Sequence, residues 1–206
     1  MANKSNKSWI SRHINDPYVK KAQAEGYPSR SAYKLLELQE KYKILKPGMR
    51  VVDVGAAPGG WSMVAKDIVG DKGQVIALDV LPLQITSQVE FIQGDFTEDA
   101  IYQQLMTLVG GHKIDVVISD IAPEMSGMRS VDQPKSMYLV ELAWDFATQV
   151  LRPGGSFLCK FFEGEGAAEF MRSVRQQAKV KTIKPKSSRT TSREMYLLAQ
   201  LGRHTI

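Results

Sequence analysis

The stretch VVDVGAAPGGW, from Val51 to Trp61, decides the fold that this sequence predicts. It begins as a run of β-branched residues interrupted by one acid, which is typical of a buried parallel strand, and then breaks into a loop rich in glycine. Gly55 permits backbone dihedral angles that a Cβ atom would forbid. Pro58 is expected to open the following helix, whose free amide groups would face a ligand, while Gly59 and Gly60 keep side chains away. We interpret the stretch as the first strand and first turn of a nucleotide-binding α/β domain.

Strand and helix patterns alternate through the rest of the sequence. Besides the strand at 51–54, apolar and β-branched runs predict strands at 74–79, 89–93, 114–120, 156–162, 180–184 and 194–200. Helical spacing of apolar residues predicts helices at 16–27, 30–42, 58–69, 98–109, 136–151 and 167–178, with Ser29 as an N-cap. Turn residues, Pro134 among them, predict a loop before the helix at 136–151. The expected fold class is α/β: a Rossmann-like, seven-stranded, mostly parallel sheet with helices on both faces, whose last strand is the candidate for an antiparallel one.

Length and composition favour one globular domain. The chain has 206 residues, 43% hydrophobic and 24% charged, which we divide into a basic N-terminal extension (1–28) and a single domain (29–206). Its only cysteine, Cys159, cannot form an internal disulfide, and three scattered histidines give no metal-ligand spacing, so no metal is expected. The first ten residues are polar and basic, and no apolar run reaches about 18 residues. We therefore expect a cytoplasmic protein with neither signal peptide nor membrane span.

Positive charge is concentrated in two parts of the chain. Residues 1–50 hold 11 Lys or Arg against 4 Asp or Glu, a net charge of +7, whereas the whole chain carries +5. A second basic segment runs from Lys179 to Arg193 with six cations and no acid. A solvated face and an unstructured leader are the simpler explanation for either segment alone. Together the two segments indicate a polyanionic partner.

Polar side chains follow several of the expected strands. Because ligands of such sheets bind beyond the carboxyl ends of the strands, these positions are candidates for a site. Asp79 could accept hydrogen bonds from both hydroxyls of a nucleoside ribose. Asp95 could accept one from an adenine amino group, beside which Phe96 offers a stacking face. Asp120 ends the next strand, and Lys160 lies within the one after it.

The glycine loop indicates the class of nucleotide. A dinucleotide site is typically G-x-G-x-x-G, whose glycines let pyrophosphate rest on the helix N-terminus. This chain has G-x-x-P-G-G instead, in which proline removes one amide donor and Trp61 adds bulk. Such a loop suits an uncharged thioether and an amino acid better than pyrophosphate. We therefore expect S-adenosylmethionine as the cofactor, bound near Gly55, Gly59 and Trp61.

Seven motifs together resemble a known family. They are SRSAYKL from Ser29, DVGAAPGGW from Asp53, GDF around Asp95, SDIAPEMSG from Ser119, MYLVELA from Met137, LRPGGSFLCKFFEGEG from Leu151 and SSRTTSREMYLLA from Ser187. The set closely resembles the FtsJ/RrmJ-type ribosomal RNA 2′-O-ribose methyltransferases over roughly residues 15–200. One departure is Glu124, which stands where members of the family often carry Asn.

The resemblance implies a Rossmann-like methyltransferase fold and an activity. A methyl group would pass from S-adenosylmethionine to the ribose 2′-hydroxyl of a uridine in the A-loop of 23S ribosomal RNA. The enzyme would act as a cytoplasmic monomer on the 50S subunit or its precursor. By matching motifs, the catalytic residues would be Lys34, Asp120, Lys160 and Glu194. The cofactor would be bound by Gly59, Trp61, Asp79, Asp95 and Asp120.

The expected chemistry leaves the role of Lys160 open. A ribose hydroxyl is a weak nucleophile, so it must be aligned with the sulfonium methyl group and lose its proton as the new bond forms. Lys160 could act as the base if desolvation and a nearby cation, Lys34, kept it neutral. Alternatively, a protonated Lys160 orients the hydroxyl and stabilises the developing alkoxide. In both versions Asp120 fixes Lys160, and Glu194 positions Lys34 or the hydroxyl.

Two other functions share part of this pattern. A binding-only ribosome assembly factor would need the basic surface but not the four polar residues together, and a nicotinamide-dependent oxidoreductase would share the fold but requires the third glycine. In the methyltransferase, we expect the leader, the helix around Arg30 and the segment 179–193 to contact RNA phosphates. Tyr27, Tyr33 and Phe162 are candidates for stacking on an unpaired base, although core packing is the alternative for each.

Overall fold

Seven strands form one mixed sheet in the computed structural model, which describes residues 16–85, 88–189 and 191–202. The strand order is β3-β2-β1-β4-β5-β7-β6. The bounds are β1 Arg50–Val54, β2 Gln74–Asp79, β3 Glu90–Gln93, β4 Ile114–Ser119, β5 Leu151–Phe162, β6 Ala178–Ile183 and β7 Glu194–Leu201. The first five strands are parallel, and β7 runs antiparallel to both β5 and β6. The sequence-based fold class, including the antiparallel last strand, is confirmed.

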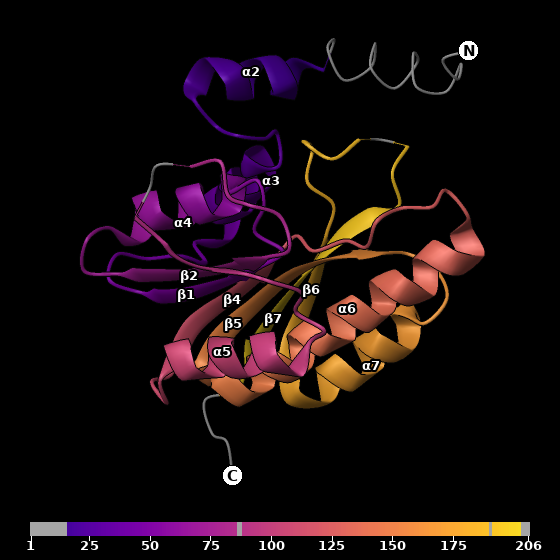
Figure 1. The fold of residues 1–206 in the computed structure, drawn as a ribbon. Coiled ribbons are helices and arrows are strands. Elements are labelled where there is room, and N and C mark those ends of the chain that lie inside the picture. The colour runs from indigo at the N-terminus through magenta and orange to yellow at the C-terminus, as the bar shows by residue number, and fades with distance from the viewer. Residues whose placement is uncertain (1–15, 86–87, 190, 203–206) are drawn as a thin grey trace.

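Helices cover both faces of this sheet (Figure 1). On one face, α5 (Asp99–Val109), α6 (Arg129–Val150) and α7 (Ala167–Gln177) pack against one hydrophobic cluster. On the other, α3 (Ala32–Tyr42) and α4 (Gly60–Val69) pack against a second. A further helix, α2 (Pro17–Glu25), lies beyond α3 and away from the sheet. None of the helices within the described ranges is long and apolar enough to cross a membrane.

The glycine loop follows β1 at the centre of the sheet. Val51, Val52 and Val54 are fully buried, because helices cover both faces of this strand. Gly55 adopts a φ of 79°, and a Cβ atom there would lie 2.6 Å from Cα of Ile121. Only glycine therefore allows the loop after β1 to pass so close to the segment that follows β4.

Helix α4 begins later than expected. It starts at Gly60, with Gly59 as its N-cap, and not at Pro58. The N–H of Gly59 donates to the carbonyl oxygen of Ala56 at 2.7 Å, so residues 56–59 form a separate turn before the helix. Pro58 belongs to that turn. The expectation that it opens the helix was wrong.

Helix α6 corrects the expected loop around Pro134. It begins at Arg129 and contains Pro134, although proline cannot donate the backbone hydrogen bond that a helix interior needs. Two neighbours hold the first turns in place. The carboxylate of Asp132 accepts hydrogen bonds from the backbone amides of residues 126 and 127, and the side-chain amide of Gln133 donates to the carbonyl oxygens of residues 162 and 165. These tertiary contacts offset the missing bond.

Helices α2 and α3 lie within the ranges expected from the sequence. The side chain of Asp16 caps α2, and Gly26 ends the helix in the left-handed conformation. Ser31, and not Ser29, occupies the N-cap position of α3. The hydroxyl of Tyr33 donates to Glu25 at 2.7 Å and thereby ties α2 to α3.

Candidate active site

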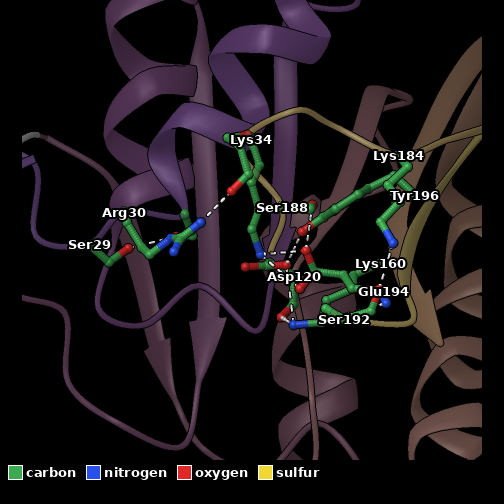
Figure 2. Close-up of polar contacts among 12 residues, drawn as sticks. Ser29, Arg30, Lys34, Asp120, Lys160, Lys184, Ser188, Ser192, Glu194 and Tyr196 are labelled. Atoms are coloured by element: carbon green, nitrogen blue, oxygen red, sulfur yellow. Dashed lines mark hydrogen bonds and ion pairs between the residues drawn. The ribbon is translucent and has the colours of Figure 1, made fainter. Parts of the chain in front are cut away.

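Four polar side chains from distant parts of the chain meet at the carboxyl ends of β4 and β5 (Figure 2). They are the predicted catalytic residues Lys34, Asp120, Lys160 and Glu194. Lys34 projects from α3, Asp120 follows β4, Lys160 lies near the end of β5, and Glu194 opens β7. Because β7 is antiparallel, its first residue reaches the same edge of the sheet as the last residues of the parallel strands. The structure thus brings all four together as two ion pairs.

The first pair joins Lys160 to Asp120. The Lys160 Nζ lies 3.2 Å from Oδ1 of Asp120 and donates to the Asp120 carbonyl oxygen at 2.6 Å. The Tyr196 hydroxyl donates to the same Oδ1 at 2.8 Å. All three residues are at least largely buried. Asp120 thus presents two oxygen acceptors to Nζ, which as an ammonium group has three donors, so one donor is left for a third partner.

Charges and hydrogen bonds fix the ionisation of Asp120. Burial acts to raise the pKa of its carboxyl group, but the positive charges of Lys160 and Lys34 and the hydrogen bonds from Tyr196 and Lys160 outweigh it, so the pKa lies below its ordinary value. Burial and the nearby negative charges of Asp120 and Glu194 raise the pKa of Tyr196 well above its ordinary value. Asp120 therefore holds Lys160 as a carboxylate, and Tyr196 remains a neutral donor.

The second pair joins Lys34 to Glu194. The Lys34 Nζ lies 2.7 Å from Oε1 and 2.8 Å from Oε2 of Glu194. The Ser188 hydroxyl donates to Oε1 at 2.8 Å, which fixes the carboxylate from its other side. Nζ of Lys34 also lies 5.7 Å from the centre of the Tyr196 ring. Tyr196 therefore separates the two ion pairs while contacting both.

The basic segment after β6 is held by helix α3. Glu37 accepts hydrogen bonds from the backbone amides of Lys186 and Ser187, at 2.7 and 3.1 Å, and from the Ser187 hydroxyl. Arg30 donates to the Ser187 carbonyl oxygen and pairs with Asp16. Glu37 lies one turn after Lys34 on α3, and Arg30 lies in the turn before this helix. The segment is therefore held at Lys186 and Ser187, beside the Lys34–Glu194 pair.

Predicted cofactor residues lie at the ends of adjacent strands. The Gly55 N–H donates to the Leu78 carbonyl oxygen at 2.9 Å, and the Gly94 N–H donates to that of Asp79 at 2.9 Å. These bonds bring together the turns that follow β1, β2 and β3. Oδ2 of Asp79 accepts the Ala57 N–H at 2.9 Å, so this carboxylate also orders the glycine loop.

The other residues predicted to bind the cofactor differ in how accessible their side chains are to a ligand. Asp95 accepts two hydrogen bonds from Thr97 on Oδ1 and none on Oδ2 among the described residues, so Oδ2 remains for a ligand. Phe96 is 3% exposed and packs edge-on against Phe146, which contradicts the expected stacking face. Trp61 is also buried and donates to the Ser31 carbonyl oxygen at 2.9 Å, so its indole forms a wall and not a free surface.

Asp53, beneath the glycine loop, was not singled out from the sequence. It is fully buried, accepts the Ser62 hydroxyl at 2.6 Å on Oδ2, and its Oδ1 has no hydrogen-bond partner among the described residues. Burial, together with the charges of Asp120 and Asp79, raises its pKa to about 7. A single acid between apolar residues indicates only an interruption in the hydrophobic pattern of a strand. The sequence does not indicate that this carboxylate is buried with one oxygen unpaired.

The candidate aromatic contacts are only partly accessible. Tyr33 is 6% exposed and has its hydroxyl engaged by Glu25, so the structure contradicts base stacking by this ring. Tyr27 and Phe162 are half-buried. Cys159 is fully buried, as expected of a small core residue, and burial raises its pKa.

The loop after Asp120 is ordered from the far side by Asp132. Hydrogen bonds from the side chain and backbone of Ser126 and from the Gly127 amide lower the pKa of Asp132. The loop leaves Glu124 and Met125 exposed beside the catalytic residues. No group of three potential metal-ligating side chains occurs in the described part of the chain.

The seven-stranded sheet carries a glycine loop, acids at the ends of successive strands and two lysine–carboxylate pairs. These features define a Rossmann-like methyltransferase dependent on S-adenosylmethionine. A family model described as FtsJ-like methyltransferase matches residues 27–201, so the chain belongs to this family.

Individual relatives agree with the family. The chain is 55% identical over 198 residues to the ribosomal RNA large subunit methyltransferase E of Pseudomonas aeruginosa, covering 96% of each. It also resembles a crystal structure of a ribosomal RNA methyltransferase from Plasmodium falciparum, with a TM-score of 0.76 and 29% identity over 87% of this chain and all of that one. A Streptococcus mutans methyltransferase solved in complex with SAH shares the fold, with a TM-score of 0.52 and 13% identity over 84% of this chain and 95% of that one.

Proposed function

We propose that this protein transfers a methyl group from S-adenosylmethionine to the ribose 2′-hydroxyl of a uridine in the A-loop of 23S ribosomal RNA. The observation that carries the proposal is the pair of lysine–carboxylate contacts, Lys160 with Asp120 and Lys34 with Glu194, at the end of the sheet where the cofactor residues converge. The relatives, which are ribosomal RNA methyltransferases, suggest the class of RNA.

The residues present fit the cofactor. The Asp79 carboxylate retains lone pairs for ribose hydroxyls, and Oδ2 of Asp95 is open to an adenine amino group. Gly55 and Gly59 both have positive φ, and a Cβ atom at either position would clash with a neighbouring residue. The loop therefore requires glycine there and carries no side chain at these two positions. When bound, the cofactor supplies an electrophilic sulfonium methyl group.

Lys160 is the group that we place against the reacting hydroxyl. Its ammonium form, fixed by Asp120, donates to the ribose oxygen and aligns it with the methyl carbon. With the cofactor bound, the ribose oxygen held by Lys160 would receive the methyl carbon, the electron pair of the carbon–sulfur bond would stay on sulfur, and the hydroxyl proton would leave to water. Glu194 holds Lys34 nearby, where its positive charge stabilises the developing alkoxide.

Partner and location follow from the same proposal. The substrate is 23S ribosomal RNA within the 50S subunit or its precursor, and the protein acts as a cytoplasmic monomer. Residues 1–28 form an RNA-binding extension to the methyltransferase domain at 29–206. The held segment after β6 supports an RNA role, because Lys184, Lys186 and Arg189 are exposed. Figure 2 shows Lys184 near the catalytic residues.

Methyl transfer to large subunits that lack the modification tests the function. The protein is incubated with methyl-labelled S-adenosylmethionine and such subunits, and the label is mapped by nuclease digestion and mass spectrometry. We expect label on one ribose 2′-oxygen with the wild type and a loss of at least 10³-fold in rate with Lys160→Ala.

Lys72→Ala is the matched control, because Lys72 is an exposed lysine in the turn before β2, outside the site. It should label subunits as the wild type does. S-adenosylmethionine binding without label on subunits or RNA would exclude the substrate and favour a binding-only assembly factor. Full labelling by Lys160→Ala would exclude the assigned centre.

A further inference from the structure

The basic segment 179–193 is divided between two ends of the sheet. Lys184, Lys186 and Arg189 follow β6 at the catalytic end. Lys179 and Lys181 lie within β6, where Lys181 pairs with Leu198 and Lys179 with Gln200. Tyr196 of the active site pairs with Ile183, so Lys179 lies four residues, or about 13 Å, further along the strand. Lys179 and Lys181 therefore lie on a part of the surface away from the catalytic residues.

That part of the surface is a cavity of about 490 Å³ on the α3 side of the sheet. Its volume lies within the range of small-ligand sites. Its floor is apolar and includes Ile44, Val116 and Leu198. Its cations come from three separate segments of the chain: Lys43 and Lys46 after α3, Arg152 in β5, and Lys179 and Lys181 in β6.

The charge of this cavity is largely unneutralised. Its single acid, Asp115, is already engaged, with Oδ2 accepting the Arg50 amide at 2.8 Å and Oδ1 accepting Arg152 Nε at 2.6 Å. Within the described ranges, none of the four lysines forms an ion pair. Lys181 instead lies over the Tyr42 ring, 5.2 Å from its centre, which places the ammonium group without cancelling its charge.

Protection of an edge strand does not explain the whole arrangement. β6 is an edge strand of the sheet, and lysines on edge strands discourage pairing with other chains. That role accounts for Lys179 and Lys181. It does not account for Lys43 and Lys46, which lie outside the sheet and line the same cavity.

We propose that this cavity is a second RNA-binding site, which holds phosphates of the same RNA whose ribose is methylated at the catalytic end. The proposal rests on the proposed function for the identity of the RNA. Lys160 and Tyr196 pair on the same face of β5 and β7 as Ser156 and Gln200, which line the cavity. Helix α3 buries this face between the two sites, but the neighbouring edge strand β6 is exposed. A strand of RNA that leaves the active site along β6 therefore passes Lys184 and meets Lys181 and Lys179 within a few nucleotides.

The variant Lys179→Gln/Lys181→Gln tests the site. Both side chains are exposed, so the fold should tolerate the change. Binding to 23S ribosomal RNA is measured by filter retention from 50 to 300 mM KCl, and methyl transfer to large subunits is measured in parallel. Losing two phosphate contacts should reduce the slope of log K against log[salt] by roughly 1.5 and raise KM by about tenfold, with kcat unchanged.

The control variant Lys72→Gln/Arg172→Gln removes two charges from exposed positions that do not line the cavity. An unchanged salt slope in the cavity variant, or an equal change in the control, would overturn the proposal. Displacement of RNA from the cavity by millimolar inorganic phosphate alone, with equal potency in the wild type and in the cavity variant, would also overturn it. Failure of the wild type to methylate any ribosomal RNA would instead overturn the proposed function, whatever the slopes show.

Discussion

Tyr196 is the residue on which both catalytic ion pairs depend. Its ring lies beside Lys34, and its hydroxyl is one of the two donors to Oδ1 of Asp120. We expect Tyr196→Phe to lower kcat by about 10- to 100-fold, because one charge-assisted hydrogen bond contributes about 1.5–3 kcal/mol, and to leave the affinity for S-adenosylmethionine within twofold. Single-turnover kinetics and calorimetry measure the two effects. Equal losses in both would mean that the tyrosine is merely structural.

Asp53 should make stability depend on pH. Its pKa is raised from 3.8 to about 7 in the folded protein, so the folded state binds the proton more tightly than the unfolded state. The resulting stabilisation is complete below about pH 4 and is lost as the pH rises through 7. Between pH 5 and 8, the free energy of unfolding should therefore fall by about 2–3 kcal/mol more in the wild type than in Asp53→Asn. Urea titration at both pH values measures this, and equal falls would contradict it.

Some site residues could be predicted from the sequence and others could not, for a physical reason. Asp79, Asp95 and Asp120 stand at the ends of apolar runs, and the geometry of a parallel sheet alone makes such positions converge. Tyr196 lies inside a strand, where an aromatic residue is an ordinary β-former, and only the register between β5 and β7 shows that its hydroxyl meets Asp120. Phe96 follows a strand end as well, yet its apolar ring is more stable in the core than beside a ligand.

Helix α3 and the turn before it act as a clamp. Glu37 and Arg30 hold the segment after β6, and Lys34 holds Glu194 at the start of β7. In Glu37→Gln, one amide oxygen must replace two carboxylate oxygens that accept three donors. We expect KM for large subunits to rise about fivefold and kcat to fall about threefold, because Ser188 then holds Glu194 less well. The affinity for S-adenosylmethionine should not change, since none of the described residues of the segment hydrogen-bonds to a predicted cofactor residue.

Glu40→Gln is the control for this clamp. It removes the same charge from an exposed position one turn along the same helix. Steady-state kinetics of both variants separate local positioning from net charge. Equal effects in the two would contradict the clamp.

At the scale of elements, the start of helix α6 was predicted wrongly because tertiary contacts help to set it. Pro134 is a local helix breaker, and local rules end the helix there. The structure continues α6 through it because Asp132 is bonded to the loop just before the helix and Gln133 to the carbonyl oxygens of residues 162 and 165. The contacts of Gln133 lie outside any local sequence window. Where only periodicity matters, as for β2, the expected and observed bounds coincide.

At the scale of the whole molecule, the two ligands should differ in their response to salt. RNA binding should lose about 10³-fold in affinity between 50 and 200 mM KCl, because it depends on many lysine–phosphate contacts. Binding of S-adenosylmethionine should change less than twofold, because its contacts are buried dipoles and carboxylates of the sheet ends. Filter binding and calorimetry on one protein preparation measure both, and parallel slopes would contradict an electrostatic RNA surface.

The order of strands has a consequence for synthesis. β7 lies between β5 and β6 although it follows β6 in the sequence, and Lys34 must wait for a partner 160 positions later in the chain. A nascent chain can assemble β1 to β4 and the glycine loop early, but a gap remains between β5 and β6 until residues 194–201 are free of the ribosome. The contact order of the catalytic centre is thus far higher than that of the cofactor half, and formation of this centre should be the slow, final step of folding.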